Sequence, residues 1–537
     1  MFCLTHQNST TGSMQRSAPR SLIAIGILLS LTVPALSQPA ATSVPGNPVS
    51  IESGLVAGKL VAGDVKAYLG IPYAAPPVGD LRWREPQPVK PWSGVRATDQ
   101  YSAPCAQRVF GPATGPAPSE DCLYLNLWIP AHPSAKKLPV IVYIFGGGYN
   151  GGSSSAPSLS GRYLAAKGVV FVNFNYRLSV LGSLGLPELT AESLHKASSN
   201  YVHLDEIAVL QWVHRNIANF GGDPGNVTLM GQSSGAIDVS YLQASPLAHG
   251  LIRRVVALSG STFPGGPWGA RPLKDVEQAG LKFQQKLGAN SLAELRALPW
   301  EKLLEASWID INEPTAADGY VLPLPAPEMV AAHKHNDVPA LLNWCRDEGF
   351  RGLINVKNLD EFKAEVQSIA GAKSEGMLNL YPASTDQQAR QAGLEAGRSG
   401  VAAKQMVGWA IAQSRGRSPA FVSVFSHGQS PGHGSDVAYW LGTIGESAAG
   451  PHAVLLTAYD LELSGKMSDA LIAFARTGNP NTAAVNWPRF DPKNPYRMDF
   501  GDRIDQVPVD KGVFFYIANP DVKVGWSVAG PPAPRSH

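Results

Sequence analysis

The chain has 537 residues, of which 44% are hydrophobic and 16% are charged, and its formal net charge is +2. This composition is typical of a globular protein with a large core and excludes a disordered or low-complexity chain. Acidic and basic residues are interspersed rather than gathered on one basic stretch, so the sequence predicts no nucleic-acid partner.

The N-terminus has the pattern of a secretory signal peptide over residues 1–37. Arg16 and Arg20 precede an apolar run from Leu22 to Val33, and small residues follow up to Ser37. The run is shorter than the ~20 residues of a membrane span, so cleavage after Ser37 is expected, with an uncleaved anchor as the alternative. Translation could start at Met1 or Met14.

Short strands and turns follow a Pro/Ala/Ser-rich segment. Residues 38–50 are predicted to be a disordered linker, and the folded domain is predicted to span 51–525, before a tail at 526–537. Two strands over 54–61 and 65–69 are separated by a turn at 62–64, which predicts a hairpin.

Further along, strands alternate with helices. Almost wholly apolar strands are expected over 140–145, 169–175, 255–258, 338–344 and 420–425, and helical spacing of apolar residues over 204–220. Apolar strands of this kind are buried on both faces, as in a parallel sheet. The pattern therefore predicts an α/β fold, with a mostly parallel central sheet and helices on both faces. The segment 264–335 is expected to add helices and loops over the active site.

Four cysteines remain to be placed. Cys3 would leave with the signal peptide, and Cys105 and Cys122 lie close together in the sequence. In an exported protein these two are expected to form a disulfide, the alternative being two buried thiols. Cys345 is then an odd thiol, expected to be buried.

The stretch from Gly231 to Gly235, Gly-Gln-Ser-Ser-Gly, fits the G-x-S-x-G nucleophile elbow. An apolar strand precedes it and a helical pattern follows it, as that turn requires. A Cβ atom at either glycine would collide with a neighbouring strand or helix. Upstream, three glycines at 146–148 follow a buried strand, where backbone N–H groups can form an oxyanion hole.

These residues, with several other blocks, resemble the type B carboxylesterase/lipase family, which includes the cholinesterases. The matching blocks run in family order from about residue 51 to 500 and include Gly70–Ala74, Ser119–Asn126, Gly146–Gly148, Asn175–Arg177, Phe220–Thr228, Asp347–Gly349, His433–Asp436 and Phe474–Asn481. The resemblance implies one large α/β-hydrolase domain.

The resemblance also implies a catalytic triad. It places the nucleophile at Ser233, the acid at Glu348 and the base at His433, in the chain order of the hydrolase fold. Asp347 and His427 are the nearest rivals, and the family pattern disfavours both. His433 would take the serine proton, and Glu348 would orient the imidazole.

The oxyanion would accept hydrogen bonds from the N–H groups of Gly147, Gly148 and Ser234. This chemistry requires no cofactor and no metal, and no cysteine, histidine and carboxylate cluster with metal-ligand spacing is evident in the sequence.

Structural pairs are implied in the same way. Arg82 with Glu120, and Arg177 with Asp223, match buried salt bridges of the family. Cys105 with Cys122 matches its first disulfide.

Some positions depart from the family pattern. Gln232 stands where many members have glutamate, Ser234 replaces a common alanine, and Asp238 is an unexpected acid in the helix after the nucleophile. The loop between the paired cysteines contains no tryptophan, which argues against a choline ester. Phe263, Trp268, Trp308 and Tyr320 favour an uncharged ester with an apolar part.

The sequence therefore predicts a secreted or periplasmic serine carboxylic-ester hydrolase whose partner is a small-molecule ester, with no membrane span after signal cleavage. One alternative is a catalytically inactive cholinesterase-like binding module. Another is an acyltransferase or lactonase using the same triad.

Overall fold

A computed structural model describes most of the chain. The described residues are 48–108, 116–133, 137–264, 269–307, 315–349, 351–447 and 456–524. The predicted signal peptide (1–37), the linker up to residue 47 and the tail (526–537) lie outside them. Val49 and Ser50, predicted to end the linker, instead belong to strand β1 (Val49–Ile51), which pairs with β2 (Gly54–Ala57).

An 11-stranded sheet organises the described part of the chain, in the order β16-β15-β14-β13-β10-β9-β7-β8-β6-β4-β3. Its strands are β3 (Lys59–Val61), β4 (Val65–Pro72), β6 (Tyr124–Pro130), β7 (Leu138–Ile144), β8 (Val170–Phe174), β9 (Gly222–Gln232), β10 (Arg254–Leu258), β13 (Ala340–Cys345), β14 (Ala420–Phe425), β15 (Tyr496–Phe500) and β16 (Ile504–Pro508). The strands from β15 to β8 pair in parallel, whereas the pairs at both edges are antiparallel. The predicted mostly parallel sheet is confirmed.

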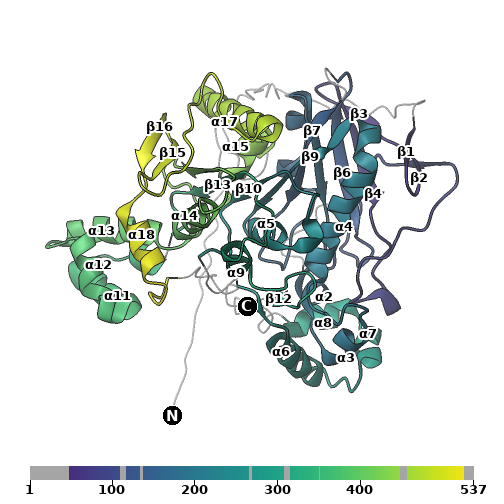
Figure 1. Cartoon of the computed structure of the whole chain (residues 1–537), viewed down its shortest axis with the longest axis horizontal. Coiled ribbons are helices and arrows are strands. Elements are labelled where there is room, and N and C mark those ends of the chain that lie inside the picture. The colour runs from purple at the N-terminus through teal and green to yellow at the C-terminus, as the bar shows by residue number, and fades with distance from the viewer. Residues whose placement is uncertain are drawn as a thin grey trace, which may run out of the picture. The chain divides into compact units, whose positions relative to one another are not determined.

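The central strands are apolar because both of their faces are covered. Every residue of β7, β8, β10, β13 and β14 is buried, and helices pack on both faces of the sheet (Figure 1). Smaller pairings join β2 (Gly54–Ala57) to β5 (Val95–Ala97) and β11 (Arg271–Pro272) to β12 (Ala316–Ala317). The predicted hairpin is confirmed only for residues 59–61 (β3), which pair with β4, because residues 54–57 form β2 in the smaller sheet.

Two helices hold the residues discussed below. Helix α4 (Tyr201–Asn216) and helix α5 (Ser234–Ala244) both pack on β9 and contact each other. The predicted helix over 204–220 therefore starts earlier than expected and finishes as a 3-10 turn, Ile217–Phe220.

The other helices do not all alternate with strands. They are α1 (Arg162–Ala166), α2 (Ser179–Ser183), α3 (Pro187–Glu192), α6 (Leu273–Lys286), α7 (Leu292–Ala297), α8 (Trp300–Ser307), α9 (Ala326–Ala331), α10 (Arg351–Ile354), α11 (Leu359–Ala370), α12 (Ser374–Leu380), α13 (Asp386–Ser399), α14 (Ala402–Gln413), α15 (Val437–Leu441), α16 (Ile444–Ser447), α17 (Ala458–Thr477) and α18 (Lys511–Ala518). Among them, α6 to α8 and α10 to α14 follow one another in unbroken runs.

One predicted salt bridge is present and the other is wrong. Arg82 and Glu120 pair at 2.5 Å. Arg177 pairs with Asp205 rather than Asp223, at 2.7 Å from Nη2 to Oδ1, and both side chains are buried. Asp205 lies on α4, facing Arg177. Asp223 instead accepts a hydrogen bond from the N–H of Gly225, within the first residues of β9.

The cysteines pair as expected. Cys105 and Cys122 form a disulfide with their Cα atoms 4.9 Å apart, and Cys345 is a buried thiol. None of the described helices is both long and apolar enough to cross a membrane.

Candidate active site

The nucleophile elbow has the predicted strand–turn–helix form. β9 ends at Gln232, α5 begins at Ser234, and Ser233 between them has φ 57° and ψ −124°. A Cβ at Gly231 would lie 2.2 Å from the carbonyl oxygen of Gly235, and one at Gly235 would lie 2.3 Å from that of Ile144. The strained backbone at Ser233 therefore depends on both glycines.

The three residues predicted as a triad meet at this turn. Ser233 Oγ lies 2.7 Å from Nε2 of His433, and Nδ1 of His433 lies 2.5 Å from Oε2 of Glu348. With its Nδ1 proton donated to Glu348, the imidazole accepts the hydroxyl proton at Nε2. This is the geometry of a serine nucleophile, a general base and a carboxylate that orients the base.

The second carboxylate oxygen of Glu348 is also held. Its Oε1 accepts hydrogen bonds from the Ser259 hydroxyl and from the N–H of Cys345, both at 2.6 Å. Ser259 follows β10 and has φ 56°. Sequence reasoning missed Ser259, because nothing near it in the chain points to Glu348.

His433 is tuned by its neighbours. Burial lowers its pKa, but the hydrogen bond and negative charge of Glu348 together outweigh burial and raise the pKa above 6.5. Asp436, three residues on, is fully buried, where it accepts a hydrogen bond from Asn343 and contacts the thiol of Cys345. Burial, followed by the charge of Glu348, raises the pKa of Asp436 to about 6. Asp436 was visible in the sequence only as part of the His433–Asp436 block.

Gln232 also reaches the base. Its amide nitrogen lies 3.3 Å from Nε2 of His433, the same nitrogen that faces Ser233. A neutral side chain therefore occupies this place beside the imidazole.

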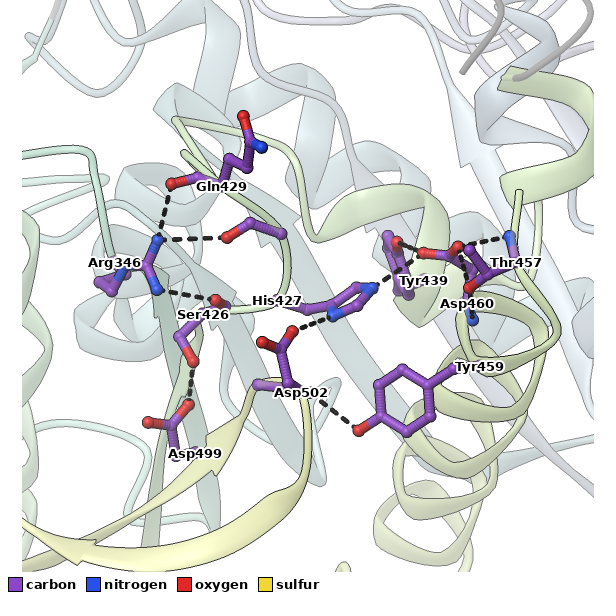
Figure 2. A network of polar contacts seen from close by, with 12 residues as sticks. Arg346, Ser426, His427, Gln429, Tyr439, Thr457, Tyr459, Asp460, Asp499 and Asp502 are labelled. Carbon is purple, nitrogen blue, oxygen red and sulfur yellow. Dashed lines mark hydrogen bonds and ion pairs between the residues drawn. The ribbon is translucent and has the colours of Figure 1, made fainter. Parts of the chain in front are cut away.

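The rival residues lie elsewhere. Asp347 forms ion pairs with Arg346 and Arg398. His427 lies between two carboxylates, with Nδ1 2.9 Å from Asp502 and Nε2 3.0 Å from Asp460 (Figure 2). Neither residue is bonded to Ser233.

Figure 2 also shows the contacts that hold the start of the loop from Ser426 to His433 in place. Arg346, two residues before Glu348, donates to the backbone carbonyls of Ser426, Gly428 and Gln429. His427 attaches the same loop to Asp460 at the start of α17. These contacts connect the turn that carries Glu348 to the loop that carries His433.

The glycine loop lies against the nucleophile. A Cβ at Gly146 would lie 2.7 Å from Cβ of Ser233, and Gly147 and Gly148 have φ 140° and 59°. The N–H of Gly148 donates to Oγ of Ser234 at 3.1 Å. The expected oxyanion donors Gly148 and Ser234 are thus neighbours, and the Ser234 hydroxyl accepts a hydrogen bond from the N–H of Gly148.

The aromatic residues proposed from sequence as substrate contacts have other surroundings. Phe263 is a core residue stacked on Trp409, with ring centroids 5.5 Å apart. Tyr320 lines a separate cavity with Trp83 and Tyr201, and no triad residue lines that cavity. Trp268 and Trp308 lie outside the described residues.

The model of the "Carboxylesterase family" matches residues 46–511. Fumonisin B1 esterase of Sphingopyxis macrogoltabida is 33% identical over 514 residues, covering 91% of this chain and 92% of that protein. Para-nitrobenzyl esterase of Bacillus subtilis (strain 168) is 33% identical over 471 residues, covering 82% of this chain and 92% of that protein.

Solved structures are similar as well. A PNB esterase structure superimposes with a TM-score of 0.73 at 29% identity, covering 88% of this chain and 99% of that one. A thermophilic PNB esterase gives 0.72 at the same identity, 29%, with coverages of 86% and 97%. The α/β-hydrolase fold is confirmed.

Proposed function

Since this chain belongs to the carboxylesterase family and is a carboxylic-ester hydrolase, we propose that it acts through an acyl-enzyme formed on Ser233. The observation that carries this proposal is the continuous hydrogen-bond chain from Ser233 through His433 to Glu348. These types of group, in this order and at these distances, are the requirements of nucleophilic acyl transfer.

In the first step His433 accepts the hydroxyl proton as Ser233 Oγ attacks the ester carbonyl carbon. Glu348 stabilises the resulting imidazolium through Nδ1, and His433 then donates the proton to the leaving alcohol. In the second step a water molecule, deprotonated by the same nitrogen, attacks the acyl-enzyme. The acid is released, and Ser233 recovers its proton.

The oxyanion is proposed to accept from the N–H groups of Gly147, Gly148 and Ser234. The N–H of Gly148 would exchange its bond to the Ser234 hydroxyl for one to the substrate oxygen. Loss of one such donor typically raises the barrier by about 2.7–4 kcal/mol.

The proposed substrates are uncharged esters. The loop closed by the Cys105–Cys122 disulfide has no tryptophan that could bind a quaternary ammonium group. We therefore expect an uncharged thioester to be cleaved faster than acetylthiocholine.

Export is part of the proposal. The disulfide suits an oxidising compartment, and residues 1–37 have signal-peptide character. N-terminal sequencing of the protein from the culture fluid or periplasm should begin at Gln38. A chain recovered only from the cytoplasm with residues 1–37 intact would contradict export.

The function is tested with p-nitrophenyl esters of graded acyl length, using the mature wild type and Ser233→Ala. Rapid wild-type turnover is expected, and the substitution should reduce kcat by about 10⁶-fold. The acyl-length optimum would report the size of the acyl pocket.

A fluorophosphonate probe provides the control. It should label the wild type at Ser233 and leave Ser233→Ala unlabelled. A folded wild type that neither turns over any ester nor reacts with the probe would contradict the proposal and favour an inactive binding module. Turnover that persists in Ser233→Ala would exclude Ser233 as nucleophile.

A further inference from the structure

A second cluster of a histidine and two carboxylates lies within the fold, behind the nucleophile elbow. His203 and Glu206 lie one turn apart on α4, so their side chains share one face of that helix. Asp238 lies on α5, which begins directly after Ser233 and packs against α4 (Figure 1). Helix packing therefore brings together three ionisable groups that the triad does not use.

The three groups point at one another. Nδ1 of His203 lies 3.2 Å from Oε2 of Glu206 and 3.4 Å from Oδ1 of Asp238. One possible metal-ligand atom from each residue, a ring nitrogen or a carboxylate oxygen, lies within 4.8 Å of the other two. All three side chains are completely buried. The sequence suggested no such cluster, because its members come from two helices.

The cluster is short of hydrogen-bond donors. Within the described residues, Oε1 of Glu206 and Oδ2 of Asp238 are buried and accept no hydrogen bond. No lysine or arginine in that part of the chain forms an ion pair with either carboxylate. Burial raises the pKa of both carboxyl groups, that of Asp238 to about 7. Leaving both ionised without compensation would cost several kcal/mol each, so the cluster must hold either a proton or a cation.

The imidazole is oriented as a ligand. Nε2 of His203 lies 2.9 Å from the hydroxyl oxygen of Thr315. A proton on Nε2 donated to Thr315 leaves the lone pair of Nδ1 directed at the two carboxylates, and metal-binding histidines are commonly oriented in this way. Burial lowers the pKa of His203 to about 3, which favours the neutral ring.

We propose that His203, Glu206 and Asp238 bind one divalent transition-metal cation of the zinc class. One imidazole nitrogen and two carboxylate oxygens suit such an ion, and the two negative charges neutralise it. Calcium, by contrast, requires six to eight oxygen ligands, more than these side chains provide.

The ion would have a structural role. Tyr149, next to the oxyanion glycine Gly148, donates its hydroxyl to Oδ1 of Asp238 at 2.8 Å. The cation would therefore fasten α4 to α5 and, through Tyr149, hold the oxyanion loop against the elbow. Because the ligands are completely buried, the metal would enter as the chain folds.

The test is the metal content of the full mature protein, purified from cells grown in zinc-supplemented and in cobalt-supplemented minimal medium. We expect about one equivalent of metal per chain by mass spectrometry in each case. The cobalt form should also show the visible absorption of a four- or five-coordinate Co²⁺ ion. Neither readout depends on esterase activity.

Two near-isosteric variants locate the site. Glu206→Gln and Asp238→Asn should each lose most of the metal and unfold at a lower temperature. Glu192→Gln, the same change of group at a carboxylate paired with Arg296, should retain the full equivalent.

A wild type that binds no metal in either medium would overturn the proposal. This measurement on the wild type tests the proposal even if the variants do not fold. The cluster would then hold a proton shared between Glu206 and Asp238, and Glu206→Gln would leave the unfolding temperature unchanged. Metal retained equally by wild type and both variants would also overturn the assignment, since it would be bound elsewhere.

Discussion

Two clusters of histidine and carboxylate flank the start of α5, and they differ in access to solvent. In the first, Ser233 and Glu348 bracket His433, whose side chain remains 33% exposed. In the second, Glu206 and Asp238 both face Nδ1 of His203, whose side chain is 0% exposed. Each cluster thus combines a histidine with carboxylate, once within reach of solvent and once fully buried.

Their electrostatics diverge accordingly. Burial lowers the pKa of both histidines, but a bond to Glu348 reverses the effect for His433, whereas nothing does so for His203. An open histidine with a fixed carboxylate can exchange protons with a substrate at each turnover. A closed cluster cannot exchange protons with a substrate, and we propose that it binds a cation instead.

The largest expected effect is on the open cluster. Glu348→Gln should lower kcat by about 10⁴-fold, because the amide no longer selects the correct tautomer or stabilises the imidazolium. Steady-state hydrolysis of p-nitrophenyl esters measures this. Asp347→Asn is the matched control and should lose less than about tenfold. Equal losses in both variants would mean that the wrong carboxylate has been assigned.

The hydrogen bond from Tyr149 to Asp238, which connects the two clusters, can be removed by substitution. Tyr149→Phe removes the donor to Asp238 and should lower the free energy of unfolding by about 1–3 kcal/mol. The substitution should lower kcat by a larger factor than it raises KM, because the glycine loop next to Tyr149 is no longer held by the hydrogen bond to Asp238. Urea unfolding and ester kinetics test both effects. Tyr459→Phe, which removes a bond to the Gly501 carbonyl, should leave kcat unchanged, and a similar kcat loss there would contradict a specific role for Tyr149.

A negative charge introduced beside His433 would test the electrostatic difference between the two histidines. Only neutral His433 accepts the serine proton, so kcat/KM should rise with pH through a pKa above 6.5. Gln232→Glu places a carboxylate near Nε2 and favours the imidazolium, so this rise should move to higher pH by about one unit. Gln232→Met, which adds no charge, should move it less. A shift to lower pH in Gln232→Glu would contradict the contact.

The smallest effect is expected at Ser234. Ser234→Ala removes the hydroxyl that accepts from Gly148, so the N–H no longer has to exchange partners when substrate binds. We expect kcat/KM to rise about threefold, or about 0.6 kcal/mol, within the range of one net hydrogen bond. A fall of more than tenfold would show that the hydroxyl itself takes part.

Local patterns were enough to predict the framework, whereas the open cluster was predicted from the resemblance to a family. Apolar runs such as 140–145 indicated central strands, because a strand covered on both faces can carry few polar groups. Gly231 and Gly235 indicated the elbow, because their positions tolerate no Cβ. The blocks around Ser233, Glu348 and His433 predicted the three residues that the fold brings together.

The tertiary structure decided which ionisable groups meet. Arg177 pairs with Asp205 instead of Asp223 because Asp205 lies on the helix that covers Arg177. Ser259 reaches Glu348, and Asp238 reaches His203, only because neighbouring strands and helices bring them together. The spacing of residues along one segment determines its secondary structure and its local turns, and this spacing can be read directly from the sequence. Contacts between segments depend on which faces pack together, so the sequence alone left the buried cluster behind Ser233 invisible.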